Sequence, residues 1–157
     1  MDGEEAGVRA LYQHLLAGWN QRRAERMAEL FLDDSLVVGF DGSQMRGARA
    51  VNDEMNRIFA DHRPARYVSI VRAVTLLRAD VAVLHAVVGM VPPGKREIKP
   101  DNNAIQTLTA VKRDGRWRIA VYQNTPARFD GRPKLAAELT AELDAAMKTR
   151  GSEVFED

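Results

Sequence analysis

The spacing of the apolar residues changes once along this chain, after Pro64, and the change limits the folds that the chain can adopt. Before Pro64 apolar residues recur every three to four positions, which is the period of an α-helix. After Pro64 they alternate over long stretches, which is the period of a β-strand. Helices followed by a run of strands predict an α+β fold, with the helices packed on one face of a curved antiparallel sheet.

The elements follow from the same pattern and from the turn residues between its segments. We expect helices over residues 4–22, 24–30 and 48–60, strands over 36–40, 67–77, 81–91, 103–112 and 117–124, and an amphipathic helix over 135–147. The 157 residues contain no repeat and no linker, which favours one domain over 1–157. Its core would span about 4–133 and its C-terminal helix about 134–150.

Composition excludes several kinds of partner and site. Lys and Arg number 23 against 22 Asp and Glu, so no net field attracts nucleic acid or an anionic membrane, and neither is expected as a partner. The chain has no Cys, its three His have no metal-binding spacing, and it has no G-x-G-x-x-G. We therefore expect no metal and no cofactor. The acidic start MDGEEAGVRALYQ and the absence of a long apolar stretch predict a cytoplasmic location.

The last predicted hairpin ends on two side-chain amides, in the stretch VYQNTP. A two-residue turn at Asp114-Gly115 pairs Arg113 with Arg116, and counting back pairs Gln106 with Gln123. Both then lie on the more apolar face, against the helices, while Asn124 falls on the opposite face. Two interpretations remain open for the pair: a hydrogen bond inside a filled core, or one end of a ligand pocket. A slip of one residue in the register would exchange the two faces.

Several stretches resemble the nuclear transport factor 2-like superfamily, which is also called SnoaL-like or cystatin-like. They are LFLDDSLVV at residues 30–38 and MRGARAV at 45–51, where a helix ends in an acidic pair, a strand follows, and a glycine turn starts another helix. DVAVLHAV at 80–87, NAIQT at 103–107 and VYQNTP at 121–126 resemble more narrowly the SgcJ/EcaC branch. Its members include accessory proteins of enediyne antibiotic gene clusters. The resemblance covers residues 8–133.

The resemblance implies a cone-shaped fold: three N-terminal helices packed into a strongly bent antiparallel sheet, with a pocket at the open end. It also implies a homodimer formed through the outer face of the sheet, where we place Tyr122, Thr107, Thr109 and Ala120. Isomerase members carry a catalytic carboxylate on the first strand. Gly39 occupies that position here, which counts against the same mechanism, and nearby Asp41 is a weaker candidate because Asp-Gly is typical of a turn.

His85 is the best titratable candidate for catalysis, because it lies in mid-strand between apolar residues. If it faces inward, it would act as a general acid–base. If it faces outward, it is a half-buried histidine on the dimer face.

The remaining pocket candidates are aromatic, sulfur-containing or amide residues near the expected open end: Trp19, Phe40, Met45, Phe59, Tyr67, Gln106 and Gln123. We expect the Trp19 indole N–H to donate to a ligand. Three functions remain: a protein that binds an apolar, oxygen-bearing, polyketide- or enediyne-like molecule, an isomerase, cyclase or hydratase that uses His85, or a non-catalytic dimeric interaction domain.

Overall fold

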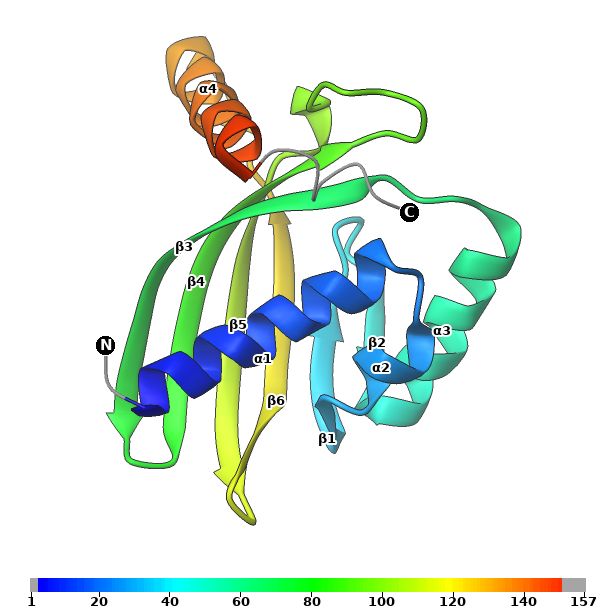
Figure 1. The fold of residues 1–157 in the computed structure, drawn as a ribbon, viewed down its shortest axis with the longest axis vertical. Helices are drawn as coiled ribbons and strands as arrows, with labels where there is room; N and C mark the ends of the chain where they lie inside the picture. Colours follow the sequence, from blue (N-terminus) through cyan, green and yellow to red (C-terminus); the bar gives the residue numbers. More distant parts are fainter. Residues whose placement is uncertain (1–2, 151–157) are drawn as a thin grey trace.

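The computed structural model describes residues 3–150, so residues 1–2 and 151–157 of the predicted domain lie outside the described part. A strongly curved sheet wraps around one long helix, and a last helix lies on the other side of the sheet (Figure 1). The elements in chain order are α1 (Gly3–Asn20), α2 (Ala24–Ala28), β1 (Phe31–Val38), β2 (Gln44–Arg46), α3 (Gly47–Asp61), β3 (Arg66–Arg78), β4 (Val81–Val91), the 3-10 helix η1 (Pro100–Asn102), β5 (Ala104–Arg113), β6 (Arg116–Pro126) and α4 (Pro133–Arg150).

The predicted α+β class is confirmed, and so are the N-terminal helices, the curved sheet and the C-terminal helix. The helix α1 lies across the concave face of the sheet because its apolar stripe is buried there, with Val8, Tyr12 and Leu15 at most 1% exposed. Inward residues of β4 and β5, such as Leu84 and Leu108, meet this stripe. These residues form the main hydrophobic core, which lies between α1 and the sheet.

The sheet is mixed and not wholly antiparallel, which corrects the prediction. Its order is β2-β1-β6-β5-β4-β3, and β1 runs parallel to β6. Consecutive strands joined by tight turns must be antiparallel, but β1 and β6 are far apart in the sequence and share no hairpin. The same long-range pairing begins β1 at Phe31, opposite Ile119, whereas the sequence pattern predicts a strand only from residue 36.

The second hydrophobic cluster lies on the outer face, where α4 covers one end of the sheet. Leu143 and Met147 of α4 pack near Val87 and Val91 of β4. Gly89 permits this approach, since a Cβ there would lie 3.1 Å from Leu143 Cδ1. The exposed Arg72 and Glu142 also form a bidentate ion pair between β3 and α4.

The β5–β6 hairpin contains a bulge that the alternation did not reveal. Arg113 pairs with Arg116 and Ala110 with Ile119, as predicted, but Thr109 then pairs with Val121. The extra residue is Ala120, and one extra residue moves every later side chain of β6 to the other face. Gln106 therefore pairs with Asn124, not with Gln123.

Candidate functional site

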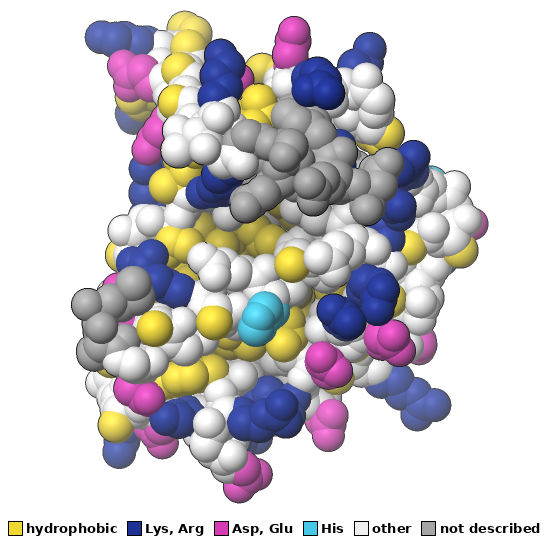
Figure 2. Space-filling view, in the orientation of Figure 1, with side chains coloured by type: hydrophobic (Ala, Val, Ile, Leu, Met, Phe, Trp, Pro, Cys, Tyr) yellow, Lys and Arg dark blue, Asp and Glu magenta, His cyan; other side chains and the backbone are white. Residues whose placement is uncertain are grey.

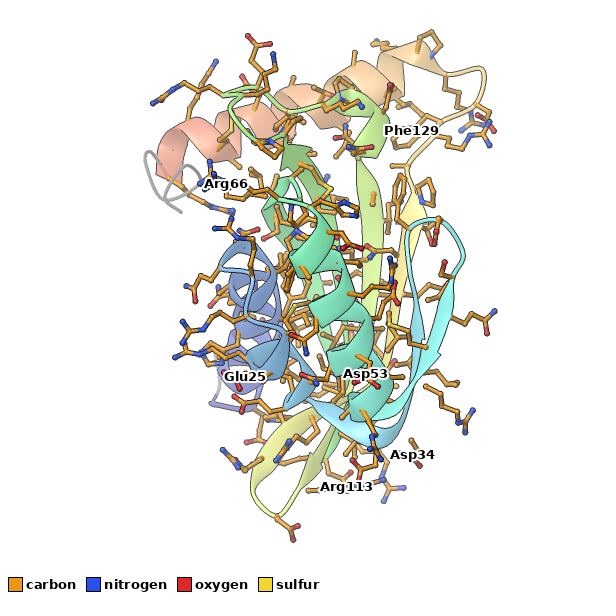
Figure 3. All side chains as sticks on the ribbon, turned by 90° about the vertical axis from the view of Figure 1, so that its right-hand side faces the viewer. Glu25, Asp34, Asp53, Arg66, Arg113 and Phe129 are labelled. Atoms are coloured by element: carbon orange, nitrogen blue, oxygen red, sulfur yellow. The ribbon has the colours of Figure 1, made fainter. Side chains whose placement is uncertain are left out.

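A cavity of about 460 Å³ opens between the C-terminal part of α1, the helix α3 and the strands β1, β2 and β6. Figure 3 views the molecule from the side of α3, with Asp53 of α3 labelled near the viewer. The cavity is lined by Leu15, Leu16, Trp19, Met27, Phe31, Val37, Val38, Gly39, Phe40, Asp41, Ser43, Gln44, Met45, Val51, Glu54, Met55, Arg57, Ile58, Tyr67, Tyr122 and Asn124.

The walls of the cavity are apolar and adaptable. Three of the chain's six methionines, Met27, Met45 and Met55, line it. Unbranched thioether side chains can change rotamer to fit irregular shapes. Such walls suit an apolar ligand of up to drug-like size and do not restrict it to a single shape.

Four of the predicted pocket residues lie in these walls: Trp19, Phe40, Met45 and Tyr67. Phe59 is set behind them and packs edge-on against Trp19, with ring centroids 5.6 Å apart. Contact of these side chains with a ligand stays a prediction.

The Trp19 indole has a structural partner instead of the expected ligand. Its Nε1–H donates to the carbonyl oxygen of Ala65 at 2.8 Å. The next residue, Asn20, accepts from the backbone N–H of Tyr67 at 2.8 Å and donates to the Tyr67 carbonyl at 3.2 Å. Together these bonds tie the end of α1 to the start of β3 and hold Tyr67 in the cavity wall.

A polar cluster forms the inner end of the cavity, which we call the floor: Tyr12, Tyr67, Gln106, Tyr122 and Asn124. The Tyr12 hydroxyl donates to Gln106 Oε1 at 2.5 Å, and Gln106 Nε2 donates to Asn124 Oδ1 at 2.6 Å. Gln106 and Tyr12 are fully buried, whereas Tyr67, Tyr122 and Asn124 reach the cavity. All three tyrosines of the chain therefore meet at one place.

Burial keeps these phenols protonated. Desolvation raises the pKa of Tyr67 to about 12, although interactions with Asn124 and Gln106 oppose the shift. Desolvation also raises the pKa of Tyr122 and that of Tyr12 well above the usual value, and neighbouring tyrosines add to both shifts. The floor is therefore neutral at physiological pH and rich in hydrogen-bond groups.

Two predicted site residues lie on the outer face of the sheet and not in the cavity. Gln123 is exposed, because the bulge at Ala120 turns it outward. His85 is also exposed and lies opposite Thr107 in the outer row of side chains. A general acid–base in the cavity cannot be His85 at this position, and the outward interpretation of this residue is the one that the structure supports.

The charged residues that line the cavity are Asp41, Glu54 and Arg57, at its mouth. The Asp41 carboxylate accepts the backbone N–H of Ser43 at 2.9 Å, and the hydrogen bonds from Ser43 lower the pKa of Asp41. Glu54 is paired with Arg57, which lowers the Glu54 pKa. Asp41 thus forms the turn that its Asp-Gly sequence predicted, and neither carboxylate has the raised pKa of a buried general base.

Sequence reasoning missed Tyr12, Tyr122 and Asn124. Tyr12 fits the apolar stripe of α1, so the helical pattern predicts only a core residue there. Tyr122 and Asn124 were assigned to the outer face by the unbulged register. The available signal was the pair of adjacent amides in VYQNTP. A register shift of one residue decides which of Gln123 and Asn124 faces inward.

Within residues 3–150, no group of three or more His, Asp or Glu side chains is placed to hold a metal ion. The helices of that part are also too short or too polar to cross a membrane. On the face drawn in Figure 2, basic and acidic side chains are interspersed, in keeping with the balanced composition. Within the described residues, neither a charged surface patch on this face nor a cluster of metal ligands indicates a site other than the cavity.

A family model described as SnoaL-like domain matches residues 8–127. Comparison with curated protein sequences gives no significant match. Solved structures share the fold. A domain of unknown function with a cystatin-like fold from Nostoc punctiforme is 19% identical, with a TM-score of 0.75 over 92% of this chain and 99% of that one.

Two further structures of this fold are described by an enzyme or by a likeness to one. A ketosteroid isomerase-like protein from Erwinia carotovora atroseptica is 15% identical, with a TM-score of 0.64 over 81% of this chain and 98% of that one. A hexachlorocyclohexane dehydrochlorinase from Novosphingobium barchaimii is 19% identical, with a TM-score of 0.64 over 78% and 85%. At these identities the likeness concerns the fold alone.

Proposed function

Because the chain belongs to the SnoaL-like domain family, we propose that it binds a small, largely apolar, oxygen-bearing molecule in the cavity between α1, α3 and the sheet. The observation that carries the proposal is the division of this cavity into apolar walls and one polar, uncharged floor. Apolar walls supply affinity, and a few convergent polar groups fix orientation. The sequence resemblance to the SgcJ/EcaC branch supports a polyketide- or enediyne-like ligand.

Binding without catalysis is the form of this function that we favour. The dehydrochlorinase indicates that the fold can host catalysis, but this cavity holds no His and no buried carboxylate among its described lining residues. Proton transfer needs a base within hydrogen-bond reach of the substrate. Placing His85 on the outer face removes the acid–base on which the isomerase, cyclase or hydratase alternative depended. The cytoplasmic location stays a prediction.

The ligand test uses Trp19 as a reporter. In a Trp117→Phe background Trp19 is the only tryptophan, because the chain has two. We expect a neutral tricyclic ketone, 9-fluorenone, to change Trp19 emission saturably, and Asn124→Leu to weaken binding by about tenfold, the worth of one lost hydrogen bond. Gln123→Leu, one residue earlier but on the outer face, is the matched control and should leave the affinity unchanged. Equal losses in both variants, or no saturable signal at all, would contradict the proposal.

We also propose a homodimer through the part of the outer face that α4 leaves uncovered. Val83, Thr109 and Val121 are paired neighbours there, and Ile105 is 39% exposed. Tyr122, which the sequence assigned to this face, is buried inside the cone. A mildly apolar face of this kind favours association with a second copy.

The dimer test introduces a charge at the centre of that face. We expect light scattering to give a dimeric mass for the wild type at micromolar concentration and a monomeric mass for Thr109→Arg, because an unpaired buried charge is costly. The control variant Thr149→Arg adds the same charge at an exposed position of α4 and should remain dimeric. A monomeric wild type would exclude this assembly.

A further inference from the structure

The mouth of the cavity differs from its apolar walls, because side chains that hydrogen-bond and carry charge line it. Asp41, Ser43 and Gln44 come from the turn between β1 and β2 and from the first residue of β2. Glu54 and Arg57 come from α3. The β1–β2 hairpin lies beside α3 (Figure 3). Two different elements therefore supply polar groups to the same opening.

The polar groups of the mouth are held in place by bonds to one another. The Asp41 carboxylate accepts the backbone N–H of Ser43 at 2.9 Å, and the N–H of Gly39 donates to the Ser43 carbonyl at 2.8 Å. On α3, Arg57 Nε donates to Glu54 Oε2 at 3.2 Å. The hydrogen bond from Arg57 lowers the pKa of Glu54, and the charge of Asp41 opposes that shift. The two carboxylates are therefore near enough to interact across the mouth.

Phe40 places an exposed aromatic ring among these polar groups. It lines the cavity and is 37% exposed, whereas the other aromatic side chains of the described lining are buried or half-buried. An apolar ring beside hydrogen-bond donors and acceptors matches a group that is apolar on one face and polar at its edge. A sugar ring is such a group, because its C–H face can leave water against an aromatic ring while its hydroxyls both donate and accept.

A ligand group with a single full charge fits the mouth less well. Both signs of charge occur there within a few residues, and Glu54 and Arg57 already pair with each other. A neutral polyhydroxyl group uses both signs, since each hydroxyl can accept from a guanidinium and donate to a carboxylate. Hydrogen bonds to charged partners are stronger than those between neutral groups.

We propose that the mouth of the cavity is a sugar subsite, so that the ligand is a glycoside whose apolar part lies between the walls. The inference rests on the proposed function and specifies its ligand class. In this arrangement the sugar stacks on Phe40, and its hydroxyls bond to Asp41 and Glu54. A mouth that is only a solvated rim would leave the sugar in water and add nothing to the affinity.

The test compares three probes on one carbon skeleton: 2-naphthyl β-D-glucopyranoside, 2-methoxynaphthalene and 2-(2-hydroxyethoxy)naphthalene. Equilibrium dialysis at a single pH measures the affinity of each for the wild type. We expect the glucoside to bind about tenfold more tightly than the methyl ether, the worth of one or two hydrogen bonds. The hydroxyethyl ether carries one hydroxyl and no sugar ring, so it should bind like the methyl ether.

Two variants test the contacts of the sugar. Phe40→Leu keeps an apolar side chain but removes the flat ring, and Glu54→Ala removes an ionised acceptor. Each should weaken binding of the glucoside severalfold and leave the affinity for the methyl ether unchanged. The matched control is Asp53→Ala, which removes the neighbouring carboxylate of α3. Asp53 is exposed and does not line the cavity, so this variant should bind all three probes like the wild type.

The outcomes separate the two proposals. If no probe binds the wild type, the proposed binding function fails and this inference fails with it. If the glucoside binds no better than either ether, binding in the cavity stands and the sugar subsite is wrong. If Phe40→Leu does not fold, Glu54→Ala still decides, because an unchanged affinity for the glucoside, or a loss equal to that in Asp53→Ala, overturns the subsite.

Discussion

Alkaline pH is expected to unfold this protein before its tyrosines ionise in the folded state. All three tyrosines lie in the floor of the cavity, and burial raises the pKa of Tyr67 from 10.0 to about 12. In the unfolded chain each phenol ionises near pH 10, whereas the folded state holds the proton longer. The stability that this provides is fully present below pH 10 and is lost as the pH rises toward 12. For Tyr67 alone the loss is on the order of 3 kcal/mol.

The measurement follows phenolate absorbance and circular dichroism together through an alkaline titration. The two signals should change in one cooperative step, because Tyr12 and Tyr122 have pKa values raised in the same direction. Tyr67→Phe removes one ionising group and should move the midpoint to higher pH. A tyrosine that ionises reversibly near pH 10, with the circular dichroism unchanged, would show that at least one phenol is exposed and would contradict the buried floor.

The parts of the fold that sequence predicted well are those held by local pattern. The apolar stripe of α1 depends on residues three and four positions apart, and the strands β3 to β6 are joined in order by turns. Asp114-Gly115 specified its hairpin because the turn itself requires those residues, and Gly115 has a φ of 77°. Such features need no knowledge of distant segments.

The parts that were missed depend on distant partners or on a single residue. The parallel pairing of β1 with β6 joins residues that lie far apart in the sequence, and the stretch around Phe31 fits a helix end as well as a strand. The bulge at Ala120 leaves no mark in the apolar alternation, because Val121 and Tyr122 both suit either face. Without the bulge Gln123 faces the pocket, and with it Asn124 does.

The site was predicted in the same uneven way. Trp19, Met45 and Tyr67 could be placed in the walls because large apolar residues near the open end of the cone have few other positions. The floor could not, since its polarity depends on which of two adjacent amides points inward. The face of His85 could not be predicted for a related reason, because β4 is apolar on both faces: Val83 and Val87 lie on the same face as His85, and Leu84 and Val88 on the other.

The largest effect of a single substitution is expected at Gly47, which begins α3 and has a φ of +86°. A Cβ there would lie 2.2 Å from the backbone oxygen of Asp33, a contact that no side-chain rotation relieves. Gly47→Ala adds this clash to the cost of a left-handed conformation, so we expect the free energy of unfolding to fall by about 2–5 kcal/mol. Chemical denaturation of the purified variant measures the loss.

Gly42→Ala is the control that separates the two costs. Gly42 also has a positive φ, of +90°, but nothing lies within 4 Å of the position that its Cβ would take. Its loss should be limited to about 1–2 kcal/mol, the cost of the backbone conformation. Equal losses at the two glycines would mean that the backbone of β1 at Asp33 moves away from the added Cβ at little cost in free energy. A larger loss at Gly47 would mean that close contact with β1 fixes the start of α3, and α3 supplies Val51, Met55 and Ile58 to the wall of the cavity.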